Sequence, residues 1–430
     1  MAMSTLPDWL KQLSPQNVVS KHPAWLSALR ETQWQVFCEQ GLPTRHYERY
    51  KHADFSFLYA NEYLVSDDVN IKALSDKIHQ HRLQHTDTIL LVLVNGRFVS
   101  HLSDVAKLPE HVVAISLRDA LQTQADSIKP HWLNDKVSTH SPFVNLNAAL
   151  CDDGLYLYVP DECVIRSPIH LLHLTLTQST LFTQSKKMVF LGKSSEVVFI
   201  EEHFSPSGSY VTNNVTTIEV NENAKLTYYK LQQESAAAVH VAHTDIQQKK
   251  DSCVELLYVG IGAQFARDDV SVYLKEQGSN CKAAGLYQLH RDRQYIDYHI
   301  DINHCAPRSQ SEMFFKGILE NKSKAVFNGR LLVENNASKI EAYQANHNLL
   351  LTNEAEVYSK PELEIYADEV KCKHGATTGQ LNQDALFYLR ARGISEEEAI
   401  NMLLEGYRRE ILQRITHEGI KLRIQEALSC

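Results

Sequence analysis

The sequence lacks the features that mark secreted and membrane-spanning proteins. Its eight cysteines are scattered and include no Cys-x-x-Cys pair, which indicates free thiols in a reducing compartment rather than a disulfide framework. No apolar run approaches the length of a membrane span. The first ten residues have neither a basic start nor an apolar signal core. We therefore expect a cytoplasmic protein with no membrane partner.

The chain also lacks an excess of positive charge. Its 430 residues include 43 lysines and arginines against 52 aspartates and glutamates, and the formal net charge is -9. Because no basic stripe offsets this balance, we expect no nucleic-acid partner. A hydrophobic content of 43% and a charged content of 22% are ordinary for a globular protein. The length is sufficient for a large core and for more than one structural unit.

Two nucleotide-binding motifs are incomplete. Gly192-Lys-Ser is the end of a phosphate loop, but Lys187 stands at the position of the first glycine, and a strand rather than a helix is expected to follow. Gly260-Ile-Gly lacks the third glycine of a dinucleotide motif, because Phe265 stands there. The sequence therefore predicts no nucleotide binding by either route.

No long helical pattern occurs between Pro142 and Lys373, where short β-branched and aromatic runs dominate. Polar turn-type residues precede four of these runs at intervals of 28 residues. Short strands with such a period are typical of a solenoid of stacked strands, and a β-sandwich is the alternative. The missing helices argue against a doubly wound sheet. We favour a parallel β-helix whose turns contain Ser195, Asn223, Asp251 and Ser279.

The regions on either side have a different character. Most of the first 85 residues follow helical patterns, and the apolar run that starts at Ile89 leads through Asn95-Gly96 into a predicted β-hairpin. At the other end, Ser395 and Glu398 form a predicted capping box. We therefore predict a mainly β protein with an N-terminal helical region and a small hairpin at 1–140, a parallel β-helix at 141–380, and a C-terminal helical region at 381–430.

The C-terminal region carries an apolar stripe at helical spacing. Such a stripe usually packs on its own domain. A small helical region has little core of its own, so a partner protein is the second interpretation. The stripe consists of Ala399, Ile400, Leu403, Leu404 and Tyr407.

The segment Lys371-Cys-Lys-His places a thiol and an imidazole two residues apart. On an extended strand Cys372 and His374 share one face, with Cα atoms roughly 6.5 to 7 Å apart, so both side chains can reach one ion. Zinc and iron–sulfur clusters usually take about four protein ligands. Either other residues complete the set or the pair is half of a site. The alternative is a coincidental spacing around a cysteine that merely packs.

Several further segments follow one another in a characteristic order: Gly41-Leu-Pro-Thr-Arg, Tyr158-Val-Pro-Asp-Glu-Cys-Val-Ile-Arg-Ser-Pro-Ile, His304-Cys-Ala-Pro-Arg-Ser-Gln-Ser, Lys316-Gly-Ile-Leu, Val326-Phe-Asn-Gly-Arg, Asn348-Leu-Leu-Leu, Lys360-Pro-Glu-Leu-Glu-Ile, Lys371-Cys-Lys-His-Gly-Ala-Thr-Thr-Gly-Gln and Leu386-Phe-Tyr-Leu-Arg-Ala-Arg-Gly-Ile-Ser. Together they resemble the SufB/SufD family of iron–sulfur cluster assembly proteins. Gly375 stands where SufB has a glutamate, and Leu389 stands where SufB tends to have a cysteine. Both positions resemble the SufD branch.

The resemblance implies a right-handed parallel β-helix between two helical regions. It also implies a non-catalytic scaffold subunit of a SufB–SufC–SufD complex that builds nascent clusters. His374 and Cys372 are then expected to bind iron or a cluster transiently at the SufB interface, with the missing ligands supplied by SufB and no cofactor held permanently by this chain alone. The SufC ATPase is expected to bind the C-terminal helices, through Ile400, Leu403, Leu404 and Tyr407.

Three alternatives stay open from the sequence. One is a homodimer that forms when SufB is absent, because the end of a β-helix permits such pairing. A carbohydrate-active β-helix enzyme would carry two acidic residues that face each other in a groove. A generic β-solenoid interaction module would have no metal role.

Overall fold

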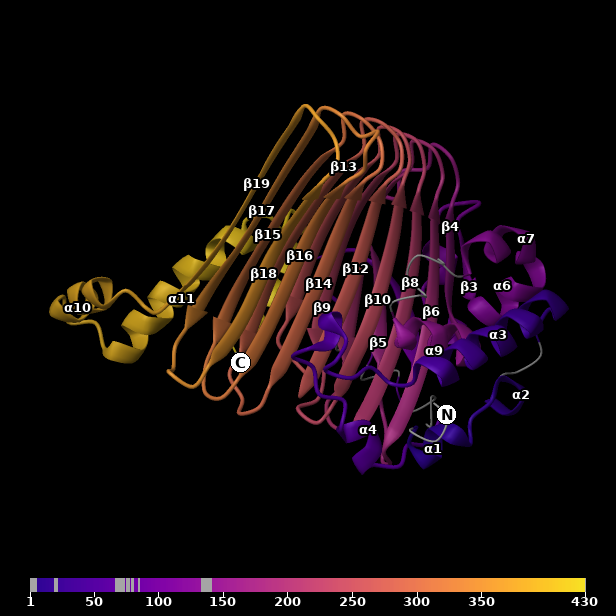
Figure 1. Cartoon of the computed structure of the whole chain (residues 1–430), viewed down its shortest axis with the longest axis horizontal. Helices are drawn as coiled ribbons and strands as arrows, with labels where there is room; N and C mark the ends of the chain where they lie inside the picture. The colour runs from indigo at the N-terminus through magenta and orange to yellow at the C-terminus, as the bar shows by residue number, and fades with distance from the viewer. Residues whose placement is uncertain are drawn as a thin grey trace.

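The computed structural model is mainly β, with a long parallel solenoid between N-terminal and C-terminal helices, as the sequence predicted (Figure 1). It describes residues 6–18, 22–65, 74, 78, 81–83, 86–132 and 141–429. Within these ranges, no helix is both long and apolar enough to cross a membrane.

Two sheets form the walls of the solenoid, and the chain passes from one to the other at every turn. In the described ranges the first sheet, called sheet A, has nine strands, and the second, called sheet B, has ten. From β4 and β5 onward all neighbours are parallel and in register. Sheet A contains β3 (Val113–Ser116), β4 (Asp153–Val159), β6 (Leu181–Leu191), β8 (Tyr210–Val220), β10 (Val239–Gln248), β12 (Phe265–Leu274), β14 (Tyr295–His304), β16 (Lys324–Val333) and β18 (Glu356–Ile365). Sheet B contains β1 (Ile89–Val94), β2 (Arg97–Phe98), β5 (Ile169–Leu174), β7 (Glu196–Phe204), β9 (Lys225–Gln233), β11 (Cys253–Gly260), β13 (Asn280–Leu289), β15 (Gln310–Leu319), β17 (Ile340–Leu350) and β19 (Val370–Gly379).

The predicted repeat corresponds to one turn of the solenoid. A residue with a left-handed backbone conformation recurs in the turn before the sheet B strands from β7 to β19. In four of these turns the next residue is a buried serine whose Oγ donates to the carbonyl three residues back, at 2.7 to 3.1 Å. The left-handed residues are Ser194, Asn223, Asp251, Gly278, Arg308, Lys339 and Glu369, and the serines are Ser195, Ser252, Ser279 and Ser309.

The predicted N-terminal hairpin is present and joins the solenoid. β1 pairs antiparallel with β2 through Asn95 and Gly96, which have φ angles of 49° and 80°. Positive φ at both residues is the geometry of a primed hairpin turn. On its other edge β1 pairs parallel with β5. The hairpin therefore extends sheet B at its first end.

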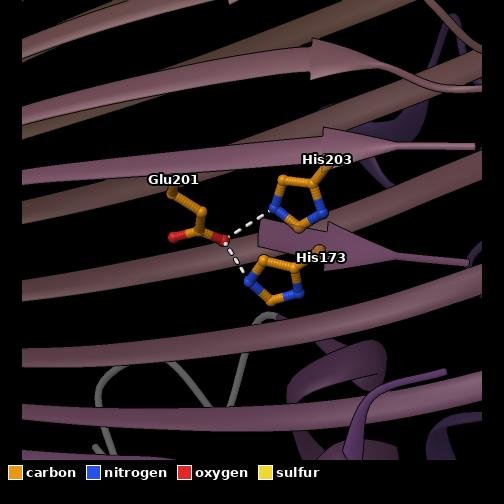
Figure 2. Close-up of side chains that lie close together, drawn as sticks. All are labelled: His173, Glu201 and His203. Carbon is orange, nitrogen blue, oxygen red and sulfur yellow. Dashed lines mark hydrogen bonds and ion pairs between the residues drawn. The ribbon is translucent and has the colours of Figure 1, made fainter. Parts of the chain in front are cut away.

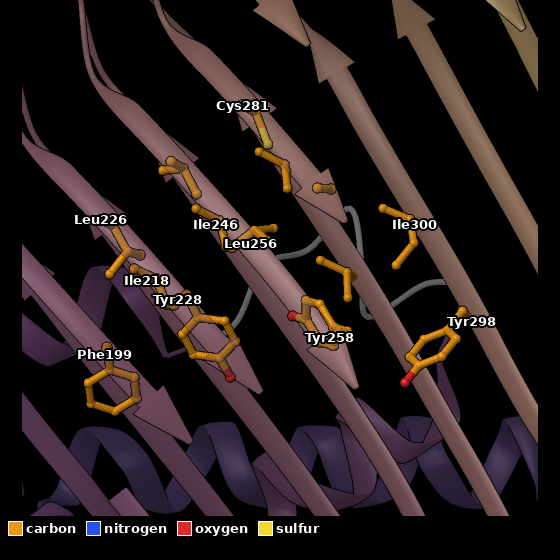
Figure 3. Packing of buried hydrophobic residues seen from close by; sticks show 14 of the residues in the cluster. Phe199, Ile218, Leu226, Tyr228, Ile246, Leu256, Tyr258, Cys281, Tyr298 and Ile300 are labelled. Atoms are coloured by element: carbon orange, nitrogen blue, oxygen red, sulfur yellow. The ribbon is translucent and has the colours of Figure 1, made fainter. Parts of the chain in front are cut away.

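Alternate residues of each strand face the interior of the solenoid, called the lumen. The first half of most sheet B strands contributes apolar side chains, and aromatic rings pack against one another from rung to rung (Figure 3). The ring centroids of Phe199 and Tyr228 are 5.8 Å apart, and those of Tyr228 and Tyr258 are 6.0 Å apart. The second half of several strands contributes polar residues instead. At these strands the lumen therefore has an apolar half and a polar half.

Helices cover the outer faces of both sheets. The N-terminal elements pack on sheet A around a cluster that includes Trp34, Phe55 and Phe143, and the C-terminal helices pack on sheet B through residues such as Ile411 and Ile420. The predicted capping box at Ser395 is formed. The helices are α1 (Asp8–Lys11), α2 (Pro15–Val18), α3 (Ala24–Gln40), η2 (Glu48–Tyr50), α4 (Phe57–Ala60), η4 (Ser100–Leu102), η5 (Val105–Lys107), α6 (Leu117–Thr123), α7 (Ala125–Ile128), η6 (Lys129–His131), α9 (Pro142–Leu150), α10 (Gln383–Ala391), α11 (Glu396–Leu412) and α12 (Glu418–Ser429).

A buried ionic network fastens the N-terminal region to sheet A. The guanidinium of Arg267 donates two hydrogen bonds of 2.8 Å to Asp269 and one of 2.6 Å to Asp297. Arg49 of η2 reaches the same face and binds Asp269 at 3.2 Å and Asp301 at 2.9 Å. Arg267 is fully buried, so its loss leaves two carboxylates without their main partner.

We predict that Arg267→Met lowers the free energy of unfolding by about 3 to 5 kcal/mol, because removing one partner of a buried ion pair leaves an uncompensated charge. Urea denaturation at neutral pH measures this difference. The matched control is Lys282→Met, which removes an exposed ion pair with Glu255 and should cost less than about 1 kcal/mol. Equal losses in the two variants would contradict the prediction.

The same network predicts a pH dependence. Burial pushes the pKa of Asp269 and Asp297 upward, but the charge of Arg267, joined at Asp269 by that of Arg49, outweighs it and holds both below the ordinary value. Their stabilising contribution is complete above about pH 4, the pKa in the unfolded chain, and declines as pH falls toward the folded-state pKa. We therefore expect the stability difference between wild type and Arg267→Met to narrow below about pH 4. If the stability difference between the two proteins stays constant with pH, the lowered pKa of Asp269 and Asp297 does not account for it.

Candidate functional site at the open end of the solenoid

Strand β19 is the last strand of sheet B, and β18 is the last strand of sheet A (Figure 1). β19 pairs in parallel with β17 along its whole length. In the described part of the chain, no strand pairs with the other edge of β19 or of β18. The solenoid is therefore open at this end, with free backbone donors and acceptors along both edges.

Cys372 and His374 lie on the lumen side of β19. In the register with β17, Cys372 is opposite Ala342 and His374 is opposite Gln344. Ala342 and Gln344 are both buried in the lumen, with exposed fractions of 0% and 4%. Since directly opposite residues of a parallel pair point to the same face, the thiol and the imidazole project over the open end of the lumen.

Because no described strand covers β19 from the other side, Cys372 and His374 are not fully enclosed. His374 is exposed, and Cys372 is half-buried against the apolar core. Burial raises the pKa of the Cys372 thiol, and a hydrogen bond from the backbone of Ala342 acts in the opposite direction. The terminal rung thus presents a thiol and an imidazole beside open space.

The chain by itself offers this site two ligands. Among the described residues, every group of three His, Cys, Asp or Glu side chains with ligand atoms close enough for one ion lies inside the lumen, and none includes Cys372 or His374. Within the described residues no third ligand of this chain joins Cys372 and His374, and the half-site stays a prediction.

The predicted apolar stripe of α11 packs partly on its own solenoid. Leu404 is buried against Ile318 and Leu349, and Ile400 and Tyr407 pack around the same cluster. The Nζ of Lys316 also donates to the backbone carbonyl of Tyr407 at 3.1 Å. These contacts fix α11 across the outer face of β15 and β17.

Beyond these contacts, α10 and the start of α11 extend away from the end of the solenoid (Figure 1). Large apolar side chains are exposed there, with exposed fractions of 74% for Phe387, 58% for Tyr388 and 50% for Met402. Leu403 is half-buried and lies outside the cluster that holds Leu404. The helices therefore combine a face that packs on the solenoid with an uncovered apolar surface.

Sequence reasoning did not identify the polar half of the lumen. Its centre is Glu201, whose carboxylate lies beside Lys187, His173 and His203. Burial, together with the charge of Lys187, lowers the pKa of His173 to about 4. The sequence did contain a signal for this cluster, because Glu201-Glu202-His203 interrupts an otherwise apolar strand. Buried ionisable residues without a partner are costly, so such residues in a buried strand predict polar partners in the interior.

The chain matches two family models. Residues 174–407 match the one described as SUF system FeS cluster assembly, SufBD core domain, and residues 10–171 match the SufBD protein N-terminal region. The chain therefore belongs to the SufBD family of iron–sulfur cluster assembly proteins, which confirms the family expected from its motifs.

Relatives within the family include proteins named SufD. The iron–sulfur cluster assembly protein SufD of Escherichia coli (strain K12) is 29% identical, with 91% of this chain and 89% of the relative covered. SufD of Bacillus subtilis (strain 168) is 24% identical, with coverages of 97% and 96%. An iron–sulfur cluster assembly SufBD family protein of Synechocystis sp. is 31% identical, with coverages of 90% and 87%. The chain is thus similar to SufD proteins over nearly its whole length.

The open end predicts a contrast between two cysteines. Cys281 is fully buried in the lumen on β13, so we expect Cys281→Ser to lower the free energy of unfolding by about 1 to 3 kcal/mol through an enclosed hydroxyl. Cys372→Ser should cost less than about 1 kcal/mol, because the Cys372 side chain is already partly exposed. Chemical denaturation measures both values. Equal losses would show that Cys372 is as enclosed as Cys281.

Proposed function

We propose that the chain is a non-catalytic scaffold subunit that acts with SufB and the SufC ATPase to build nascent iron–sulfur clusters. The observation that carries this proposal is the position of Cys372 and His374 on the lumen side of an uncovered terminal rung. Family membership favours this role over a carbohydrate-active enzyme and over a generic interaction module.

The open edges make the same end a surface for pairing. Strands with unpaired backbone groups readily bind another strand. A SufB solenoid that docks on β18 and β19 would satisfy those groups and cover the lumen. Where SufB is absent, a second copy of this chain would serve the same edges. Pairing of either kind places the partner's side chains next to Cys372 and His374.

The chemistry of the pair suits a site shared between two chains. Thiolates are the usual ligands of iron–sulfur clusters, and imidazoles bind ferrous iron well. Two ligands leave about two to be supplied by the partner. The raised pKa of the Cys372 thiol keeps it protonated until a metal ion displaces the proton. Iron and the cluster are cargo in this scheme, held during assembly and then passed on.

We predict that His374→Ala leaves the complex with SufB and SufC intact but lowers its cluster content about tenfold, in line with the loss of a metal-site residue. The three proteins are co-purified under anaerobic conditions, and iron and sulfide are measured per complex. The matched control is Lys373→Ala on the opposite face of β19, which should retain the wild-type content. An intact complex with normal cluster content would remove His374 from the mechanism.

We assign SufC binding to the C-terminal helices, where the sequence predicted it through Ile400, Leu403, Leu404 and Tyr407. The support is the apolar surface that α10 and α11 leave uncovered beyond the solenoid. Because Leu404 also holds α11 on β15 and β17, a charged residue there would disturb the solenoid itself. Leu403 lies outside that cluster, so a charged residue there tests SufC binding without disturbing the packing of α11 on the solenoid.

The double change Met402→Asp and Leu403→Asp should weaken SufC binding at least about tenfold, since it places charge on the uncovered apolar surface. Binding is measured by titration with purified SufC. The control is Asn401→Asp, which adds a charge at an exposed position of the same helix without removing apolar surface. Unchanged affinity in the double variant, with a wild-type melting temperature, would refute the assignment.

A further inference from the structure

Three metal-ligating side chains converge in the polar half of the lumen. His173 comes from β5, and Glu201 and His203 come from β7, the next strand of sheet B. Figure 2 shows both imidazoles turned toward the same carboxylate oxygen. Glu201 Oε1 lies 2.6 Å from Nε2 of His203 and 3.2 Å from Nε2 of His173. All three side chains are buried.

We propose that His173, Glu201 and His203 form a binding site for a first-row divalent metal ion inside the solenoid. Two imidazoles and one carboxylate form a ligand set that binds ferrous iron, cobalt and zinc. The site is separate from the open terminal rung, where Cys372 and His374 lie. It also stands independently of the proposed scaffold function, because it uses only ligands of this chain.

The distances fit this ligand set. With metal–ligand bonds of about 2.1 Å, ligand atoms around one ion are roughly 3 to 3.5 Å apart. The separation between His173 and Glu201 is already in this range, and that between His203 and Glu201 is slightly shorter. The rings of His173 and His203 stack with centroids 4.1 Å apart, so both Nε2 atoms face one region.

The atom that marks the site is Nε2 of His173. It is buried and lacks a hydrogen-bond partner, because its 3.2 Å contact with Glu201 does not have hydrogen-bond geometry. An unpartnered ring nitrogen in an enclosed site is costly. A metal ion bound to that nitrogen would remove the cost.

A cation already pairs with the carboxylate. The Nζ of Lys187 lies 2.6 Å from Glu201 Oε1, and the hydroxyl of Tyr228 donates to Oε2. Tyr228 therefore orients the carboxylate so that Oε1 faces the imidazoles, as the outer partners of metal ligands commonly do. Lys187 competes with the metal ion, because both are cations that bind the same oxygen.

A neighbouring group of ligands is less suitable. His203 also lies close to Glu234 and His240. However, Nδ1 of His240 lies 2.7 Å from Glu234, and its Nε2 lies 3.1 Å from Nζ of Lys230. A metal ion bound by Nε2 of His240 would lie against the ammonium of Lys230, and one bound by Nδ1 would displace the Glu234 contact, whereas Nε2 of His173 has no hydrogen bond to lose. We therefore assign the site to His173 rather than to His240.

Cobalt(II) is the probe, because imidazole and carboxylate coordination gives it visible absorption bands. The full-length chain is produced in cobalt-containing medium, so that metal is present while the lumen closes, and is then dialysed. We expect about one tightly held cobalt per chain. His173→Ala and His203→Ala should each lower the retained cobalt about tenfold or more, whereas the double variant Cys372→Ser, His374→Ala should retain it.

Lys187→Met provides a second test that keeps all three ligands. Removal of the competing ammonium should raise cobalt affinity about tenfold or more, and the bound metal should raise the melting temperature of this variant more than that of the wild type. Circular dichroism checks that each variant is folded. Absence of retained cobalt in both wild type and Lys187→Met would overturn the proposal. Unchanged retention in folded His173→Ala and His203→Ala would overturn it as well.

Discussion

A parallel solenoid depends on the next rung at every level. Each strand from β4 onward obtains its hydrogen bonds from the strands beside it, and each layer of inward side chains is covered by the layer that follows. At the first end, the β1–β2 hairpin and β3 extend the sheets. At the last end, in the described part of the chain, no further strand does so. The same constraint that makes the core continuous therefore leaves β18, β19, Cys372 and His374 available to another molecule.

The interior shows where this fold departs from maximal stability. Stacked aromatic and aliphatic rungs would give a dry core throughout, as they do in the apolar half. The polar half instead buries carboxylates, lysines and histidines, and buried ion pairs are weak contributors to stability because desolvation offsets their attraction. Perturbed ionisable groups of this kind are concentrated at functional sites. The cluster around Glu201 is consistent with this tendency, as the proposed metal site requires.

The flanking helices serve the solenoid in two ways. The N-terminal elements are held on sheet A by aromatic packing and by the ion pairs that Arg49 makes with Asp269 and Asp301. The C-terminal helices pack on sheet B and then continue past its end. One helix, α11, thus connects the solenoid core with an uncovered apolar surface.

Local patterns in the sequence determined the periodic features: the turns at Asn223 and Asp251, the hairpin at Asn95-Gly96, and the capping box at Ser395. Each depends on residues close together in the chain. That Cys372 and His374 lie on the same face of their strand also followed from strand geometry. Only the tertiary structure decided that Leu404 packs on β15 and β17, and that His173 meets Glu201. Those contacts join residues far apart in sequence, and their geometry depends on the register between strands, which no local pattern specifies.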